Sequence, residues 1–283
     1  MSDPVDDRSA TPGAPRTDSL DHELVEGVDA ELHVERFSPA PGEVTDAAPV
    51  LLIHGFASST DLNWVRPGWV RELTRAGRTV LTVDLPGHGR SGPATVEDCL
   101  PSRIRADLLQ ILAQEGVVPI GPDGGGVDLI GYSFGARLSW ELAAAQPELV
   151  RRVVLGGAAA NDRFVAFDLE SARAHLESGA DVEHDETRMF LSMARAAGNA
   201  MDPILTFIRA AQREPFHPET MVPRQPVLLA AGENDELAAG MGDLVALLEA
   251  AGGSPETVLV PGRDHLSAVT SRGLKDAALA FLA

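Results

Sequence analysis

The sequence has 283 residues, with 23 Lys and Arg against 42 Asp and Glu, so its formal charge is −19. Hydrophobic residues make up 44% and charged residues 23%, a composition typical of a globular protein with a large core. That composition excludes a wholly disordered chain, a coiled coil and a collagen-like fibre. The acidity argues against non-specific nucleic-acid binding, which needs a basic surface, so we expect no nucleic-acid partner.

Cysteine content and the N-terminal residues bear on the compartment. The single cysteine, Cys99, allows no disulfide within the chain. The first residues carry acids where a signal peptide needs a basic and then an apolar stretch, and no apolar run reaches the ~20 residues of a membrane span. We therefore expect a cytoplasmic protein without a membrane partner. Residues 1–22 are rich in Pro, Ser, Thr and Asp, which predicts a disordered tail.

From Glu23 onward, short apolar runs alternate with segments of helical period. Several runs are continuous Val/Ile/Leu blocks, which suit parallel strands buried on both faces. Strands are predicted at Ala30–Phe37, Val50–Ile53, Thr79–Val83, Val127–Ile130, Arg152–Leu155, Val227–Ala231 and Thr257–Val260. Helices are predicted at Trp64–Ala76, Ile104–Glu115, Phe134–Ala145, Leu237–Ala251 and Leu266–Leu282. This alternation predicts crossover units and an α/β sheet.

One long segment interrupts the alternation. Residues 162–213 show helical spacing without a convincing strand, and they are too many for an ordinary loop. We predict a helical lid at 157–220, inserted into an α/β core formed by residues 23–156 and 221–283. Residues 161–190 hold eight acids against three arginines. This charge fits a solvated helix face, or alternatively a lid that disfavours anionic substrates.

The strongest chemical signal is the sequence from Val127 to Gly135, VDLIGYSFG. An apolar strand leads directly into Gly131-x-Ser133-x-Gly135, and a helix follows at once. This context predicts a nucleophile elbow, in which a tight strand–turn–helix exposes the Ser133 hydroxyl. Side chains at Gly131 and Gly135 would clash with neighbouring elements. The pattern predicts a serine nucleophile, although a purely structural turn is the alternative.

A serine hydroxyl is a weak nucleophile near neutral pH and needs a base. His265 follows the last predicted strand, on a loop that can reach the carboxyl edge of the sheet. Asp235 follows the preceding strand, and the order Ser133, Asp235, His265 matches that of one hydrolase fold. Glu233 and Asp264 are weaker candidates for the acid.

The third expected component is an oxyanion hole. One donor would be the backbone N–H of Phe134, the residue after the serine, and the other that of Phe56, after the strand that ends in His54-Gly55. Gly55 lets the backbone approach the substrate. We expect His54 to support the site by packing rather than to act as the catalyst.

These motifs resemble those of the α/β-hydrolase superfamily, in its compact branch of serine esterase-like enzymes with a helical lid. Further matching pieces are Leu51-Leu-Ile-His-Gly-Phe56, Val83-Asp-Leu-Pro-Gly-His-Gly-Arg-Ser91 and Gly232-Glu-Asn-Asp235. The resemblance implies an α/β-hydrolase fold with a mostly parallel eight-stranded sheet flanked by helices. It also implies no metal and no organic cofactor. In this branch Asp84, His88 and Ser91 usually build structure near the site.

The function predicted from these residues is a serine hydrolase that cleaves carboxylic esters of small to medium apolar substrates through an acyl-serine intermediate. Carbon–carbon hydrolases, lactonases and cofactor-free haloperoxidases use the same triad and remain open. So does a lyase like the menaquinone-pathway synthase, which places an arginine four residues past the serine, as Arg137 is here. A catalytically silent ligand-binding protein of this fold is the alternative of another class.

The expected partner is a small-molecule ester, and the sequence does not predict an oligomeric state. Substrate-binding candidates are Gly55, Trp64, Phe190 and Met193, with Leu62 and Met201 as further apolar residues. For the apolar side chains among them, packing in the lid or in a helix is the competing interpretation.

Overall fold

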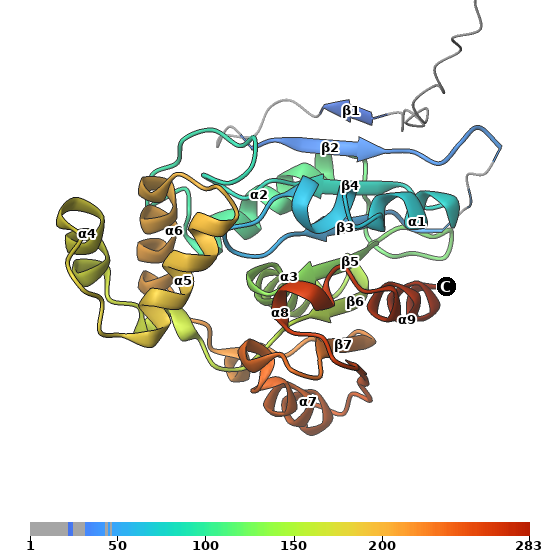
Figure 1. Cartoon of the computed structure of the whole chain (residues 1–283). Coiled ribbons are helices and arrows are strands. Elements are labelled where there is room, and N and C mark those ends of the chain that lie inside the picture. The colour runs from blue at the N-terminus through green and yellow to red at the C-terminus, as the bar shows by residue number, and fades with distance from the viewer. Residues whose placement is uncertain (1–21, 25–31, 43–44, 46) are drawn as a thin grey trace, which may run out of the picture.

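The protein is described by a computed structural model, which defines residues 22–24, 32–42, 45 and 47–283 (Figure 1). Its centre is an eight-stranded sheet of order β1-β2-β4-β3-β5-β6-β7-β8. The strands are β1 His22–Leu24, β2 Val34–Phe37, β3 Val50–Ile53, β4 Val80–Val83, β5 Val127–Tyr132, β6 Val150–Gly156, β7 Val227–Gly232 and β8 Glu256–Val260. The pairs β1–β2 and β2–β4 are antiparallel, and the other five pairs are parallel. The mostly parallel eight-stranded sheet expected from the sequence is therefore confirmed.

Helices cover both faces of this sheet, as Figure 1 shows. On one face, α2 (Pro101–Gln114), α3 (Phe134–Ala145) and α7 (Met241–Ala250) pack against strand residues such as Ile53 and Leu129. On the other, α1 (Trp69–Arg75), α8 (His265–Ala268) and α9 (Arg272–Leu282) pack against residues such as Leu52 and Ile130. Strands β3, β4, β5 and β7 are buried along their whole length, which explains their continuous apolar runs.

Three predicted helices are each divided in two. The segment Trp64–Ala76 breaks at Pro67-Gly68, because proline lacks an N–H and Gly68 takes a φ of +85°. A π-helical turn, η1 (Asp61–Val65), precedes the break. The segment Leu237–Ala251 forms the 3-10 turn η4 (Glu236–Ala238) and α7, and Leu266–Leu282 forms α8 and α9.

Between β6 and β7 the chain forms α4 (Leu169–Ser178), α5 (Asp185–Ala196) and α6 (Met201–Arg213), flanked by the 3-10 turns η2 (Arg163–Ala166) and η3 (Pro218–Thr220). Figure 1 shows the three helices gathered at one end of the sheet. Within the described ranges, no helix is long and apolar enough to cross a bilayer. Residues 1–21 of the predicted tail and 30–31 of the first predicted strand lie outside those ranges, whereas His22 begins β1.

Candidate active site

Ser133 occupies the turn between β5 and α3. Its backbone has φ +54° and ψ −116°, a conformation that residues other than glycine rarely adopt. Such strain persists only where the surrounding structure enforces it. Here the Ser133 N–H donates to the Gly156 carbonyl at 2.8 Å, and α3 begins at the next residue. The turn leaves Ser133 partly exposed between two buried neighbours, Tyr132 and Phe134.

Two glycines allow this turn to pack tightly. A Cβ at Gly131 would lie 2.2 Å from the Gly135 carbonyl oxygen, inside the start of α3. A Cβ at Gly135 would lie 2.0 Å from the carbonyl oxygen of Ile53, at the end of β3. Both contacts are far below van der Waals distance, so both positions require glycine, as the sequence predicts.

His265 and Asp235 meet beside this turn. The His265 Nδ1 lies 2.9 Å from both carboxylate oxygens of Asp235. Asp235 also accepts hydrogen bonds from the N–H groups of Leu237 and Ala238, at 3.0 Å each, and so caps η4. Because a carboxylate is an acceptor, Nδ1 carries the proton and Nε2 is left as a base.

The other two acid candidates have different partners. Asp264 caps α8 and accepts hydrogen bonds from the backbone and side chain of Ser267, which lower the pKa of its carboxyl. Glu233 accepts a hydrogen bond from the Gly262 N–H at 2.9 Å. Of the three carboxylates, only Asp235 therefore contacts the imidazole of His265.

The two expected oxyanion donors lie beside Ser133. Phe134 is the first residue of α3, where a backbone N–H has no partner within the helix. The segment before Phe56 also approaches the serine, since a Cβ at Gly55 would lie 3.1 Å from Ser133 Cβ. Within the described part of the chain, neither N–H donates a hydrogen bond. Both donors are therefore available to a substrate oxygen.

Two cavities share Ser133 and His265. The smaller, of about 80 Å³, is lined by Phe164 of η2 and Phe190 of α5, and also by the polar or charged Asn161, Arg137, Asp162 and Arg163. The larger, of about 270 Å³, is mainly apolar and is lined by Gly55, Phe56, Leu62, Met193, Leu266 and Val269 among others. Within the described residues no hydrogen bond joins Ser133 to His265, and a catalytic hydrogen bond of this kind often tightens only when substrate binds.

Of the four substrate-binding candidates, Gly55 and Met193 line the larger cavity and Phe190 the smaller. Trp64 lies elsewhere. Its side chain is fully buried in the core between η1 and α1, where its ring packs edge-to-face against Trp69 with centroids 5.6 Å apart. It lines neither cavity. The sequence could not show this, because a large apolar ring packs into a core as readily as into a binding site.

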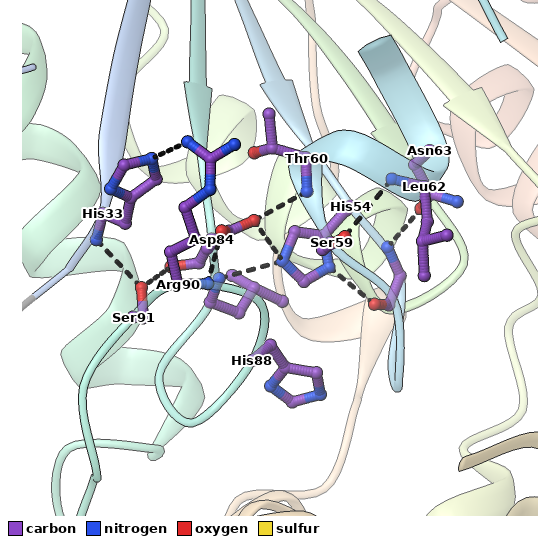
Figure 2. A network of polar contacts seen from close by, with 12 residues as sticks. His33, His54, Ser59, Thr60, Leu62, Asn63, Asp84, His88, Arg90 and Ser91 are labelled. Atoms are coloured by element: carbon purple, nitrogen blue, oxygen red, sulfur yellow. Dashed lines mark hydrogen bonds and ion pairs between the residues drawn. The ribbon is translucent and has the colours of Figure 1, made fainter. Parts of the chain in front are cut away.

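The block from Asp84 to Ser91 forms a network of polar contacts beside the site (Figure 2). Asp84 accepts hydrogen bonds from the N–H groups of Thr60, at 2.6 Å, and Arg90, at 2.8 Å. Ser91 donates to the Asp84 carbonyl. Asp84 thus holds the loop after β4 against the loop after β3. Ser91 accepts a hydrogen bond from the His33 N–H at 2.9 Å and holds the same loop beside the start of β2, so both residues agree with the structural role expected for them.

His88, in the same block, is fully enclosed by protein. It donates from Nδ1 to the Pro86 carbonyl at 3.0 Å, and its ring packs edge-to-face on Phe207 of α6. Burial lowers the pKa of His88 to about 3, so the ring is neutral near pH 7. This neutral ring packs the block against the inserted helices.

Arg137 joins α3 to both ends of the inserted helices. Its guanidinium donates to Asp162 at 3.0 Å, to Glu141 at 3.2 Å and to the Glu214 carbonyl. It also lies over the rings of Phe134 and Phe216. The charge of Arg137 is thus already balanced by two carboxylates, an arrangement that leaves little attraction for an anionic substrate.

Sequence reasoning missed Tyr132 and Asn63. The Tyr132 hydroxyl donates to the His265 carbonyl at 2.6 Å, and burial raises the pKa of that hydroxyl. Asn63 accepts a hydrogen bond from the Gly55 N–H at 3.0 Å. Tyr132 precedes Ser133 in the sequence, and this neighbouring position is the one feature that could have identified it as a residue of the site. Nothing in the sequence pairs Asn63 with Gly55.

Comparisons with known proteins agree with this fold. A family model for the alpha/beta hydrolase fold matches residues 48–180. The sn-1-specific diacylglycerol lipase ABHD11 of Danio rerio is 33% identical over 113 residues, which are 39% of this chain and 31% of that protein. A pyrrolizixenacetamide deacetylase of Xenorhabdus hominickii is 28% identical over 114 residues, 40% of this chain and 39% of that protein. The matches therefore span about a third of the length of these relatives.

The similarity to solved structures extends over most of the chain. A crystal structure from a study of carboxylesterases of Nitrososphaera gargenis superposes with a TM-score of 0.67 at 15% identity, covering 92% of this chain and 97% of that one. At this identity the likeness concerns the fold alone. Together with the family model and the sheet described above, it leads to one conclusion. The chain has the α/β-hydrolase fold.

Proposed function

We propose that this protein is a serine carboxylesterase that acts on esters with small to medium apolar acyl groups. The observation that carries the proposal is the placement of Ser133, at φ +54°, on the same two cavities as a histidine held by a buried carboxylate. Ester hydrolysis also agrees with the lipase and esterase names among the similar proteins.

In the proposed mechanism, Ser133 attacks the ester carbonyl carbon while His265 takes the hydroxyl proton at Nε2. Asp235 orients the ring and stabilises the imidazolium that forms. The N–H groups of Phe56 and Phe134 hold the oxyanion. The alcohol leaves with the proton from His265, and an acyl-serine remains. Water activated by the same histidine then releases the acid.

The cavities suggest where the acyl group binds. The larger cavity is lined mainly by apolar groups, including Met193 of α5, and we assign it to the acyl chain. We further propose that residues 157–220 act as a lid, since Phe190 and Met193 of this segment line the two cavities. Chain-length preference is then set by how far α5 leaves the larger cavity open.

The lyase-like alternative has less support. A dicarboxylate substrate needs cationic groups free to bind it, whereas Arg137 already contacts Asp162 and Glu141. An ester with an uncharged acyl chain makes no such demand. The carbon–carbon hydrolase, lactonase and haloperoxidase alternatives use the same reacting groups, and substrate tests separate them from the esterase.

The test is hydrolysis of p-nitrophenyl esters from acetate to palmitate by wild type and Met193→Trp. Wild type should hydrolyse the short and medium esters. Met193→Trp should lower kcat/KM for octanoate about tenfold or more relative to acetate, because an indole would occupy space that the longer chain needs. Ser192→Trp, on the exposed side of α5, is the matched control and should keep the wild-type profile.

Two outcomes would contradict the proposal. Folded wild type that hydrolyses none of these esters would shift the assignment to carbon–carbon cleavage or ligand binding. An unchanged chain-length profile in Met193→Trp would show that the acyl chain does not bind in the larger cavity.

A further inference from the structure

His54 is fully buried at the end of β3, and its hydrogen bonds fix its protonation state. The Leu85 N–H donates to His54 Nε2 at 2.9 Å, so Nε2 has no proton. The neutral ring then carries its proton on Nδ1, which donates to the Gly55 carbonyl at 2.7 Å. The Asp84 carboxylate lies 3.8 Å from Nε2, but burial outweighs its charge and lowers the pKa of His54, which keeps the ring in this neutral form.

The Gly55 carbonyl belongs to the peptide group that contains the Phe56 N–H. A trans peptide is planar, and its C=O and N–H point in opposite directions. All peptides of the described residues are trans. A donor that holds the Gly55 oxygen therefore also sets the direction of the Phe56 N–H.

The backbone around this peptide is held on both sides. The Gly55 N–H donates to Asn63 Oδ1 at 3.0 Å, which fixes the preceding peptide. Ala57, two residues later, has a φ of +55°, a conformation that costs energy for alanine and needs support from its surroundings. Figure 2 shows His54 between the loop after β3 and the loop after β4, with contacts to both.

We propose that His54 is a positioning residue that aims the Phe56 N–H at the substrate oxyanion by holding the Gly55 carbonyl through Nδ1–H. It acts through the peptide and touches no reacting atom. The inference rests on the proposed function, because an oxyanion forms only if Ser133 attacks a carbonyl.

Two substitutions distinguish the roles of the two ring nitrogens of His54. In His54→Asn, the amide N–H can stand in for Nδ1 and donate to the Gly55 carbonyl. In His54→Gln, the amide oxygen can stand in for Nε2 and accept from Leu85, but the Nδ1–H donor to the Gly55 carbonyl is lost, and that oxygen keeps only the longer hydrogen bond from the Ser58 N–H, at 3.3 Å. Each variant loses one buried hydrogen bond, so their thermal midpoints should fall by similar amounts.

The measurement is kcat and KM on the best ester, together with the affinity for an alkyl trifluoromethyl ketone. This inhibitor forms a tetrahedral adduct whose oxygen occupies the oxyanion hole. His54→Gln should lose about 10²-fold in kcat with KM little changed, and a similar factor in ketone affinity. His54→Asn should restore kcat to within about tenfold of wild type. If His54 had only a structural role, kcat and ketone affinity would fall equally in both variants.

Equal losses of kcat in the two variants, or wild-type ketone affinity in His54→Gln, would overturn the proposal. A wild type without esterase activity would instead refute the proposed function. If His54→Gln does not fold, the tautomer of His54 in the wild-type protein tests the proposal instead. ¹⁵N NMR of histidine-labelled wild type at pH 7 should show His54 protonated at Nδ1 only. A cationic ring, or one protonated at Nε2, would overturn the proposal.

Discussion

Replacing Ser133 with alanine should reduce kcat for the best ester about 10⁶-fold, because no acyl-enzyme can form. The fold should survive. Alanine also has a Cβ, so the strain at φ +54° stays the same, and the Ser133 hydroxyl makes no hydrogen bond to another described residue that the change would remove. We expect a thermal midpoint close to that of wild type. Single-turnover kinetics and thermal unfolding of the purified variant check both expectations.

Ser139→Ala is the matched control for this prediction. Ser139 is a buried serine on the same helix, and its hydroxyl donates to the Gly135 carbonyl at 2.8 Å. Its loss should lower the free energy of unfolding by about 1 kcal/mol and leave kcat within a few-fold of wild type. Should Ser133→Ala retain more than about a hundredth of wild-type activity, the nucleophile would have to be sought elsewhere.

The second large effect is expected at Asp235. Asparagine presents an N–H to His265 Nδ1, which then becomes an acceptor, and the ring proton moves to Nε2. His265 in that tautomer cannot take the serine proton, and the loss in kcat should be about 10⁴-fold, as for this exchange in serine protease triads. Asparagine is also a good N-cap, so η4 should persist. Steady-state kinetics at pH 7, with circular dichroism to verify folding, measure the effect.

Two other acidic residues provide controls for the Asp235 prediction. Asp264→Asn keeps the cap of α8, and Glu233→Gln alters an exposed carboxylate that does not contact His265. Both variants should stay within about threefold of wild-type kcat. A loss in either that matches the loss in Asp235→Asn would assign the third member of the triad to that residue instead.

Much of the sheet was predictable because its strands are buried on both faces. Val50–Ile53, for example, matches β3 residue for residue, since a run of four apolar residues marks a central parallel strand. The break at Pro67-Gly68 carried a sequence signal too, but the apolar period on both sides of it favoured one helix. β1 pairs at the sheet edge through backbone groups and leaves no apolar run to find.

The candidate site was predictable to the extent that local sequence defines it. The glycines around Ser133 could be predicted because the turn requires them, and the sites of Asp235 and His265 followed from strand ends meeting at one sheet edge. Trp64 was placed wrongly, because periodicity does not distinguish a ring in the core from one in a cavity. The contacts of Asn63 and Tyr132 are hydrogen bonds to backbone, and residue type alone does not reveal such partners.

Covalent labelling would show whether Ser133 is an activated nucleophile. The native protein would be treated with a fluorophosphonate, and the adduct located by peptide mass spectrometry. We expect one phosphonate per chain on the peptide that contains Ser133, and none in Asp235→Asn on the same time scale. A folded protein that stays unlabelled, or that is labelled at another residue, would contradict this expectation.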